Sequence, residues 1–435
     1  MTPAPRRIVG IADTDSYVKW AAALLGGLSG ETDAELLVLE TPVVVSPAQL
    51  RSAVAGSGLE RVARVEYDEL ASRLAALRPD VVLIAARGPL VRVLARLVAG
   101  LVPRPVIVSG LPGISIPATR KALVYRTQCD LFVLHSRREV REFAALARER
   151  GMPQRFALTR LPFAQESPED RLTRPTSADV ESRGDAIEPT GTDLVFAAQA
   201  IVPREREDRL RVARLLVRAA EADPSGRVVL KVRGRTGEHQ THVEHDALPD
   251  LIASLGPLPP NLVTSTAPMS KALDSAHGLV TVSSTAAVEA IARGIPVIAL
   301  DTFGVTPRLI NLVFEDSGLF GSEEDVVARR FRHPSASWLR DNYFHEPADD
   351  DLPLLLADLV ARRREGRLAP KPPLARAGGR FRDAWERKLV LGPHDHTPSG
   401  FAAMAIGMPL RGVVRMGQRV RRWVIGPTPA QQTAT

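Results

Sequence analysis

Residues 279–301 read LVTVSSTAAVEAIARGIPVIALD, and they contain one complete strand–helix–strand unit. The apolar run over 278–282 predicts a buried strand, the segment 285–293 predicts a helix, and 295–300 predicts a second buried strand. Gly294 stands just past the helix, where a C′ glycine commonly ends one. Because two strands joined by a helix usually lie parallel with a right-handed crossover, this stretch predicts an α/β fold with a parallel sheet.

The same alternation of apolar strands and helices extends over most of the chain. Before residue 164, the runs that predict strands are 7–12, 34–39, 62–66, 79–86, 105–109 and 129–135. After residue 192, they are 194–198, 227–233, 261–265, 278–282 and 295–300. Between the two sets the composition is rich in Pro, Ser, Thr, Asp and Glu, which is typical of a linker. We therefore expect two Rossmann-like, doubly wound domains facing each other across a cleft. The expected parts are a first domain over 1–163, a linker over 164–192, a second domain over 193–369 and a basic tail over 370–435.

The net charge of +7 is concentrated at the C-terminal end. Residues 1–369 hold 46 Lys and Arg against 47 Asp and Glu, whereas residues 370–435 hold 11 against 3, a net +8. A neutral body with 5% aromatic residues disfavours a nucleic-acid partner. Within the tail, residues 401–425 mix apolar residues with Arg411, Arg415, Arg419, Arg421 and Arg422. This mixture is typical of a segment lying on an anionic membrane; the alternatives are a disordered tail or a helix packed on the first domain.

The rest of the composition bears on the compartment. Cys129 is the one cysteine among 435 residues, which excludes an internal disulfide and suits a reducing environment. We find no signal-peptide pattern and no run of the roughly 18–20 apolar residues that span a bilayer. We therefore expect a cytoplasmic protein, with the tail as a means of attachment to the inner face of the membrane. The motifs of P-loop ATPases, nucleophile-elbow hydrolases and dinucleotide oxidoreductases do not occur.

Three hydroxyl residues, Ser283, Ser284 and Thr285, stand between a predicted strand and the helix that follows it. Open parallel sheets bind ligands at the carboxyl ends of their strands, and the N–H groups of a helix start favour an anion. These residues are therefore candidates to bind phosphate, or else one serine is only the helix cap. Glu289 follows about one turn later and either accepts hydrogen bonds from ribose hydroxyls or only stabilises the helix dipole.

The run Ser283–Ser284–Thr285, Glu289–Ala290 and Gly294–Ile295–Pro296 resembles the donor-domain motif of GT-B-type glycosyltransferases. It is most similar to that of bacterial capsule and cell-surface polysaccharide enzymes, including glycerophosphate polymerases. It also resembles a largely actinobacterial glycosyltransferase family of unassigned specificity. The resemblance implies a GT-B-like pair of domains, the acceptor on the first and a nucleotide-sugar donor on the second. It further implies that the three hydroxyl residues hold the donor phosphate and Glu289 the ribose, with no metal ion or other cofactor. Similar units occur in nucleotide-sugar 2-epimerases.

A second candidate for donor binding is the stretch KVRGRTGEHQTHVEH over 231–245. Lys231, Arg233 and Arg235 leave a strand end, where alternation places them on one face, able to bind a pyrophosphate or an anionic acceptor. The alternative is a solvated basic loop. Capsule-type enzymes often carry a Lys-x-His-Pro-like motif here, whereas this chain has Arg233–Gly234. The histidine spacing does not match a zinc site, and we expect His239 to contact the substrate.

The candidate catalytic residues lie in the first domain. Asp13, the first candidate, and Asp15, the second, follow the first strand, and His135 ends the run 129–135. An inverting transferase needs a general base for the acceptor hydroxyl, and Asp or His can serve. The alternatives are an Asx-turn or N-cap for the aspartates and a packed core position for His135.

The acceptor side is expected to include the loop over 109–117, SGLPGISIP. Gly110 and Gly113 would let its backbone approach a ligand closely, and Arg126 follows the loop. The resemblance, together with these features, implies a glycosyltransferase that moves a sugar from a nucleotide-activated donor to a cell-envelope glycan or lipid-linked acceptor. Hexosyl transfer and sialyl- or Kdo-type transfer both stay open. The alternatives are a nucleotide-sugar 2-epimerase and a non-catalytic nucleotide-sugar-binding subunit of an envelope polysaccharide system.

Overall fold

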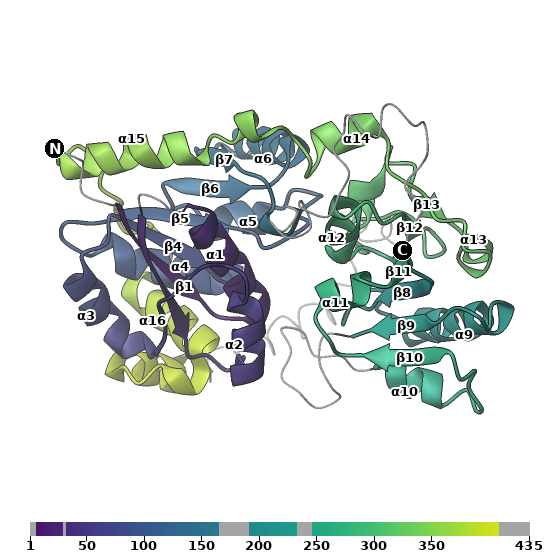
Figure 1. The fold of residues 1–435 in the computed structure, drawn as a ribbon. Helices are drawn as coiled ribbons and strands as arrows, with labels where there is room; N and C mark the ends of the chain where they lie inside the picture. The colour runs from purple at the N-terminus through teal and green to yellow at the C-terminus, as the bar shows by residue number, and fades with distance from the viewer. Residues whose placement is uncertain (1–5, 29–31, 165–190, 233–245, 409–435) are drawn as a thin grey trace, which may run out of the picture.

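The computed structural model describes residues 6–28, 32–164, 191–232 and 246–408. Within these residues the chain forms two parallel sheets, one in each half (Figure 1). The first has the strand order β3-β2-β1-β4-β5-β6-β7 and the second the order β10-β9-β8-β11-β12-β13. In both sheets the order reverses beside the first strand of the domain, which defines a switch point. The predicted pair of doubly wound, Rossmann-like domains is therefore confirmed.

The elements of the first domain follow the predicted alternation closely. Its strands are β1 (Arg6–Ala12), β2 (Thr32–Leu39), β3 (Val62–Val65), β4 (Val81–Ala85), β5 (Val106–Gly110), β6 (Leu131–Leu134) and β7 (Phe156–Leu158). Its helices are α1 (Asp15–Gly27), α2 (Pro47–Val54), α3 (Tyr67–Leu77), α4 (Gly88–Ala99), α5 (Arg120–Tyr125) and α6 (Arg137–Glu149), followed by the 3-10 turn η1 (Pro162–Ala164).

The second domain is built in the same way. Its strands are β8 (Asp193–Ala197), β9 (Val228–Lys231), β10 (Leu262–Ser265), β11 (Ala276–Thr281), β12 (Val297–Leu300) and β13 (Phe320–Gly321). Its helices are α9 (Arg206–Ala222), α10 (Leu248–Ala253), α11 (Met269–Leu273), α12 (Ala286–Ala292), α13 (Glu323–Val327) and α14 (Ala336–Asp341), with the 3-10 turn η2 (Leu312–Phe314). Two further helices, α15 (Leu352–Arg364) and α16 (Gly379–Leu391), follow, with the 3-10 turns η3 (Pro347–Asp349) and η4 (Gly392–His394).

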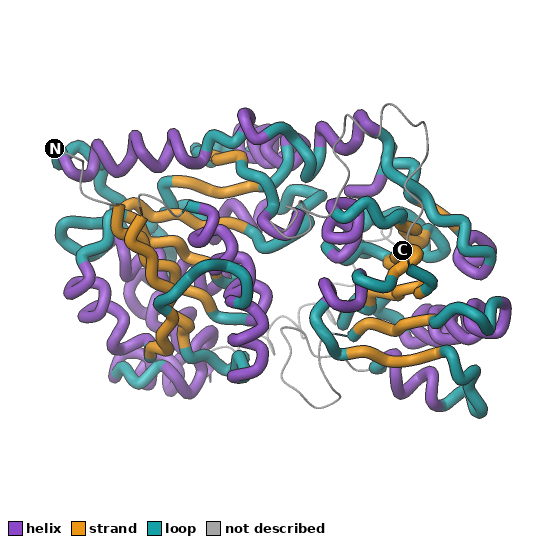
Figure 2. The backbone as a smooth tube through the Cα atoms, in the orientation of Figure 1, coloured by secondary structure: helices purple, strands orange, loops and turns teal. Residues whose placement is uncertain are grey.

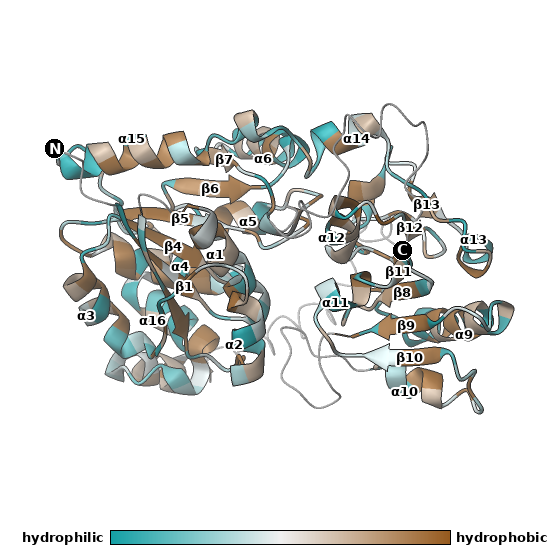
Figure 3. Ribbon diagram, viewed as in Figure 1, coloured by the Kyte–Doolittle hydropathy of each residue, from teal (hydrophilic) through white to brown (hydrophobic). Residues whose placement is uncertain are grey.

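Helices cover both faces of each sheet, and the central strands accordingly consist of apolar residues that are buried on both sides. All residues of β4, β5 and β8 are buried, and the strands stand out as hydrophobic in Figure 3. In the first domain, α1 and α15 pack on one face, and α3, α4 and the end of α16 pack on the other. Burying both faces of these short strands is what fixes their position in the middle of the fold.

The chain returns to the first domain after the second is complete. The late helix predicted over 351–364 forms as α15, but it lies along the first sheet rather than within the second domain (Figures 1 and 2). Arg363 Nη1 is 2.8 Å from Asp80 Oδ1 at the start of β4, and the Leu158 N–H donates to Asp351 Oδ1 at 2.7 Å. Helix α16 then packs against α4. The sequence-based boundary at 369 thus differs from the packing, which assigns α15 and α16 to the first domain.

The two domains share one apolar cluster. It continues from the α1 face of the first sheet through Ile116 and Leu161 to the small residues Ala286, Ala287 and Ala290 of α12. Helix α12 contacts η1, the turn at which the chain leaves the first domain. Helix α12 begins at the switch point of the second sheet, so its contact with η1 places that switch point on the side of the second domain that faces the first.

Candidate functional site

The carboxyl edge of the second sheet is organised by a glutamine that follows β8. Gln199 Oε1 accepts a hydrogen bond from the Ser283 N–H at 3.0 Å, and Gln199 Nε2 donates to Ser283 Oγ at 3.1 Å. The buried guanidinium of Arg209 donates to the carbonyl oxygens of Gln199 and Pro203 at 3.1 and 3.2 Å. The loops after β8 and β11 are therefore locked together at the switch point, where parallel sheets bind ligands.

The three predicted phosphate-binding residues lie at this switch point, between β11 and α12. Ser284 Oγ accepts from the Ala286 N–H at 3.2 Å, and the Ser284 N–H donates to Thr281 Oγ1 at 3.1 Å. Ser283 is nearly buried, whereas Ser284 and Thr285 are half-buried. The N-cap residue of α12 is Thr285, whose side chain makes no capping hydrogen bond, so neither serine is the N-cap that was the alternative from sequence. Ser284 and Thr285 keep exposed surface at the strand end.

Glu289, the predicted ribose ligand, contacts the first domain directly. Its Oε1 lies 3.1 Å from Lys19 Nζ on α1, and the two side chains are 17% and 42% exposed. A β-carbon placed on Gly113 would lie 2.4 Å from Thr285 Oγ1, so the loop after β5 lies against the start of α12 and a larger residue would force a shift there. The structure therefore brings the predicted donor residues and the predicted acceptor loop together.

The predicted basic donor stretch is described only at its beginning. Lys231 is the last residue of β9, is 7% exposed, and donates to the backbone carbonyl of Val232. Arg233, Arg235 and His239 lie outside the described residues. Lys231 is on the strand next to β8, so its backbone reaches the same edge of the sheet as Gln199.

In the first domain, the switch point between β1 and β4 holds an ion pair between a buried aspartate and a partly exposed arginine. Asp13 has no exposed surface; its Oδ2 accepts from Arg87 Nε at 2.7 Å and its Oδ1 from the Arg87 N–H at 3.3 Å. Burial raises the pKa of the Asp13 carboxyl, and the Arg87 guanidinium opposes that rise. Asp15, the first residue of α1, is half-buried and accepts from Ser16 Oγ at 3.5 Å. Of the two predicted bases, Asp15 is the one with surface that a substrate can reach.

His135 has the packed position that was the alternative to a catalytic role. It is fully buried, and its Nε2 accepts from Trp20 Nε1 at 2.8 Å. Nδ1 therefore carries the proton and donates to the carbonyl oxygen of Thr159 at 2.9 Å. Burial lowers the pKa of His135, which favours this neutral form. Both ring nitrogens are engaged inside the first domain, which leaves none for a substrate.

The other predicted acceptor residues support the loop from beneath. Arg126 is 1% exposed; its Nη2 donates to the Gly110 carbonyl at 2.7 Å and its Nε to Ser109 Oγ at 3.1 Å. Its guanidinium also lies over the ring of Phe132, 4.7 Å from the centroid. A β-carbon on Gly110 would lie 2.5 Å from the Trp20 ring, so this glycine is needed for packing. Gly110 and Arg126 shape the loop, and Gly113 is the member that reaches the second domain.

Sequence reasoning missed three residues that organise the site: Arg87, Gln199 and Glu139. Glu139 is fully buried at the start of α6 and accepts from the His135 N–H at 2.8 Å and the Tyr343 hydroxyl at 2.8 Å. Arg87 and Gln199 both follow a strand beside a switch point, so the rule that found Asp13 and Ser283 could have found them. Glu139 does not directly follow a strand; Ser136 and Glu139 have the spacing of a helix start, but the contact with Tyr343 joins residues 204 positions apart and leaves no local pattern.

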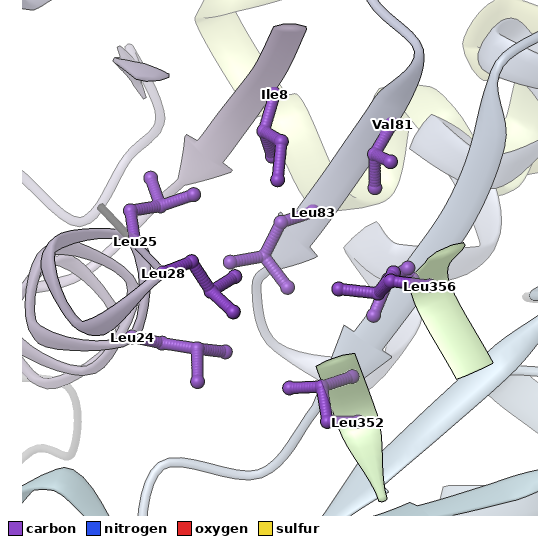
Figure 4. A pocket seen from close by; sticks show the side chains of 9 residues that line it. Ile8, Leu24, Leu25, Leu28, Val81, Leu83, Leu352 and Leu356 are labelled. Atoms are coloured by element: carbon purple, nitrogen blue, oxygen red, sulfur yellow. The ribbon is translucent and has the colours of Figure 1, made fainter. Parts of the chain in front are cut away.

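One hollow in the described part of the chain lies away from both switch points. An apolar hollow beneath α15 is lined by Ile8, Leu24, Leu25, Leu28, Val81, Leu83, Val108, Leu352 and Leu356 (Figure 4). It lies toward the amino ends of the strands and has no polar lining residue, so it is a packing feature of α15. No group of three His, Cys, Asp or Glu among the described residues is arranged to hold a metal ion. None of the described helices is both long and apolar enough to traverse a bilayer.

Comparison with known proteins adds a family and a fold. A family model described as "Putative glycosyltransferase (DUF6716)" matches residues 8–359. Curated protein sequences give no significant match. Among solved structures, the "putative UDP-N-acetylglucosamine 2-epimerase" of Listeria monocytogenes is similar at 12% identity, over 86% of this chain and 100% of that chain, with a TM-score of 0.52. The UDP-GlcNAc 2-epimerase of Methanocaldococcus jannaschii, in complex with UDP-GlcNAc and UDP, is similar at 10% identity, over 81% and 99%, with a TM-score of 0.52. At these identities the likeness shows the fold alone, a GT-B-type pair of parallel-sheet domains.

Proposed function

The chain belongs to the DUF6716 glycosyltransferase family, and from this premise we propose that it transfers a sugar from a nucleotide-activated donor to an acceptor hydroxyl. The observation that carries the proposal is the position of Ser284, Thr285 and Glu289. They stand at the switch point of the second sheet and touch the first domain through Lys19 and Gly113. A donor bound there would have its sugar between the two domains, where an acceptor on the first domain can meet it.

The donor is proposed to bind through its phosphates and its ribose. The Ser284 and Thr285 hydroxyls and the backbone at the start of α12 would contact the phosphates, and the Glu289 carboxylate would accept from the ribose hydroxyls. The M. jannaschii protein of similar fold was solved with UDP-GlcNAc and UDP, which makes uracil the first base to test. Lys231, together with Arg233, Arg235 and His239 beyond the described residues, is proposed to lie on the nucleotide side of this site.

We propose Asp15 as the general base, because Asp13 is buried and paired with Arg87. A carboxylate at the first turn of α1 can take the proton of an acceptor hydroxyl as that oxygen attacks the anomeric carbon. The departing nucleotide phosphate would be stabilised by hydrogen bonds at the donor site without a metal ion. Asp15→Asn should lower kcat without weakening nucleotide binding, and added EDTA should leave the rate unchanged.

A 2-epimerase is the second candidate, and the fold shared with two such proteins favours it. The two reactions differ in their dependence on an acceptor. A transferase releases nucleotide as fast as it forms a glycosylated product. An epimerase needs no acceptor and forms either the nucleotide-linked epimer or, where water cleaves the sugar–phosphate bond, nucleotide and free epimerised sugar. Product analysis by mass spectrometry separates the two.

The acceptor is proposed to be an envelope glycan or a lipid-linked precursor, reached at the inner face of the membrane. The helix over 398–408 buries Ala403 and Gly407 but leaves Phe401, Ile406 and Met408 each more than half exposed. The arginine-containing remainder of residues 401–425 lies outside the described residues. An apolar helix face followed by cationic sequence suits an anionic lipid surface. Deleting residues 401–435 should abolish binding to vesicles containing phosphatidylglycerol, and unchanged binding would contradict this part of the proposal.

The nucleotide-sugar site itself is tested by thermal shift with CMP, UDP, GDP, UDP-GlcNAc, CMP-sialic acid and CDP-glycerol. A ligand that binds the folded state raises the melting temperature by mass action. At least one nucleotide should stabilise the wild-type protein, and the shift should shrink in Ser284→Ala and Glu289→Ala. No shift with any nucleotide, or equal shifts in both variants, would contradict the donor site.

A further inference from the structure

The switch point of the first sheet presents a cation that the proposed donor site does not use. Arg87 follows β4 directly and is the N-cap residue of α4, at the crevice between β1 and β4. Its side chain is 31% exposed, although its Nε is bonded to the fully buried Asp13 at 2.7 Å. Within the described residues, neither Nη group of Arg87 has a hydrogen-bond acceptor. The Nε group of Arg87 is thus bonded to protein, and its two Nη groups are available to donate to a ligand.

The geometry of Asp13 explains how the arginine is held. The Asp13 carboxylate accepts hydrogen bonds from both the side chain and the backbone N–H of Arg87. These two bonds fix Arg87, although the two residues are 74 positions apart in the sequence. An arginine held in this way loses little further side-chain freedom when it binds an oxyanion. Asp13 has no surface of its own and acts through Arg87 as a positioning residue.

A second group at the same crevice also has no protein partner. Thr14, between Asp13 and the first residue of α1, is fully buried, and its Oγ1 finds no hydrogen-bond partner within the described residues. Buried hydroxyls are nearly always satisfied, and Thr14 directly follows Asp13, the residue that holds Arg87, so its hydroxyl is a donor available to an oxyanion at this crevice. The amino end of α4 adds a favourable dipole for negative charge at this point.

We propose that Arg87, held by Asp13, binds an oxyanion on the acceptor, a phosphate or carboxylate close to the hydroxyl that is glycosylated. The inference rests on the proposed transferase function and adds to it the class of acceptor, which is anionic. The donor phosphates are assigned to the other domain, and Arg87 lies on the first domain's side of the contact made by Lys19 and Gly113. A neutral acceptor would leave the guanidinium fork and its buried counter-ion without a role.

The test compares small oxyanions on the full chain. Melting temperatures are titrated with inorganic phosphate and, separately, with glucuronate, at constant ionic strength set by chloride. Removing Arg87 alone would leave Asp13 as an uncompensated buried charge, so the main variant is the neutral pair Asp13→Asn/Arg87→Gln. Arg87→Lys is the conservative variant, which keeps the charge and loses the fork.

Wild type should respond to at least one oxyanion, phosphate indicating a phosphorylated acceptor and glucuronate a uronic acid. The apparent Kd should rise at least tenfold in Asp13→Asn/Arg87→Gln and less in Arg87→Lys. Glu289→Ala should keep the oxyanion response while losing its response to nucleotide.

A neutral-pair variant that keeps the wild-type oxyanion response, or a wild type that responds to neither oxyanion, would overturn the inference. Loss of nucleotide binding in the neutral pair would also overturn it, by assigning Arg87 to the donor. Absence of any nucleotide response in wild type would instead count against the transferase function.

Discussion

Glu289→Ala tests whether the second domain holds a nucleotide through its ribose. Two hydrogen bonds from ribose hydroxyls to a carboxylate are worth about 1.5–3 kcal/mol each. Against this stands the ion pair with Lys19 in the free protein, at 3.1 Å and with Lys19 42% exposed. A pair so exposed is worth about 0–1 kcal/mol. The net loss is therefore at least about 2 kcal/mol, which corresponds to a rise in Kd of about thirtyfold or more.

Isothermal titration with the nucleotide that stabilises wild type most provides the assay. Glu221→Ala is the matched control, because Glu221 is an exposed carboxylate at the end of α9. The control should bind as wild type does, while Glu289→Ala should bind at least about thirtyfold more weakly. A Kd for Glu289→Ala within about twofold of wild type, from a variant with an unchanged melting temperature, would refute the assignment of Glu289 to the donor.

Four further outcomes are expected. Lys19→Met should leave nucleotide binding unchanged or tighten it up to about fivefold, because it releases the Glu289 carboxylate at a cost of no more than about 1 kcal/mol; a large loss in the same titration would contradict this. Gly113→Ala should destabilise the protein by about 1–3 kcal/mol in chemical denaturation through its clash with Thr285 Oγ1, and the added change Thr285→Ala should restore most of the loss. Because burial lowers the pKa of His135, the unfolded chain binds more protons below about pH 6.5; stability should fall by up to about 1.4 kcal/mol per pH unit as the pH drops. Melts of His135→Gln from pH 7.5 to 5.5 should lack that contribution. Deleting residues 379–435 should lower the melting temperature markedly, since α16 closes one face of the first sheet, and an unchanged temperature would contradict the packing.

Much of the fold could be predicted because its central strands are continuous apolar runs between helices. The runs over 79–86 and 295–300 became β4 and β12 with small changes at their ends. Strands β7 and β13 were missed because they are only three and two residues long. The return of α15 to the first domain was also missed, because pairing such as Arg363 with Asp80 joins residues 283 positions apart and leaves no local pattern.

In the candidate site, the positions of the residues could be predicted from the sequence, but the roles of their side chains could not. The place of Ser283, Ser284 and Thr285 follows from a local rule, that ligand residues come after strands, and the structure puts them at a switch point. What each side chain does there depends on distant partners that no local pattern shows. His135 is satisfied by Trp20, 115 positions away, and Asp13 by Arg87, 74 positions away. The sequence was therefore sufficient to predict which sheet edge carries the site. It was not sufficient to distinguish a catalytic base from a histidine packed in the core, as His135 is.

The central claim is that the protein transfers a sugar from a nucleotide donor to an acceptor. The most direct measurement is mass-spectrometric analysis of the products formed from a stabilising nucleotide-sugar, with and without an extract of envelope glycans and lipids. We expect nucleotide release that depends on the extract, a new glycosylated product, and loss of both in Ser284→Ala. An epimerised sugar, either free or still linked to the nucleotide, formed at the same rate with and without the extract would contradict the claim.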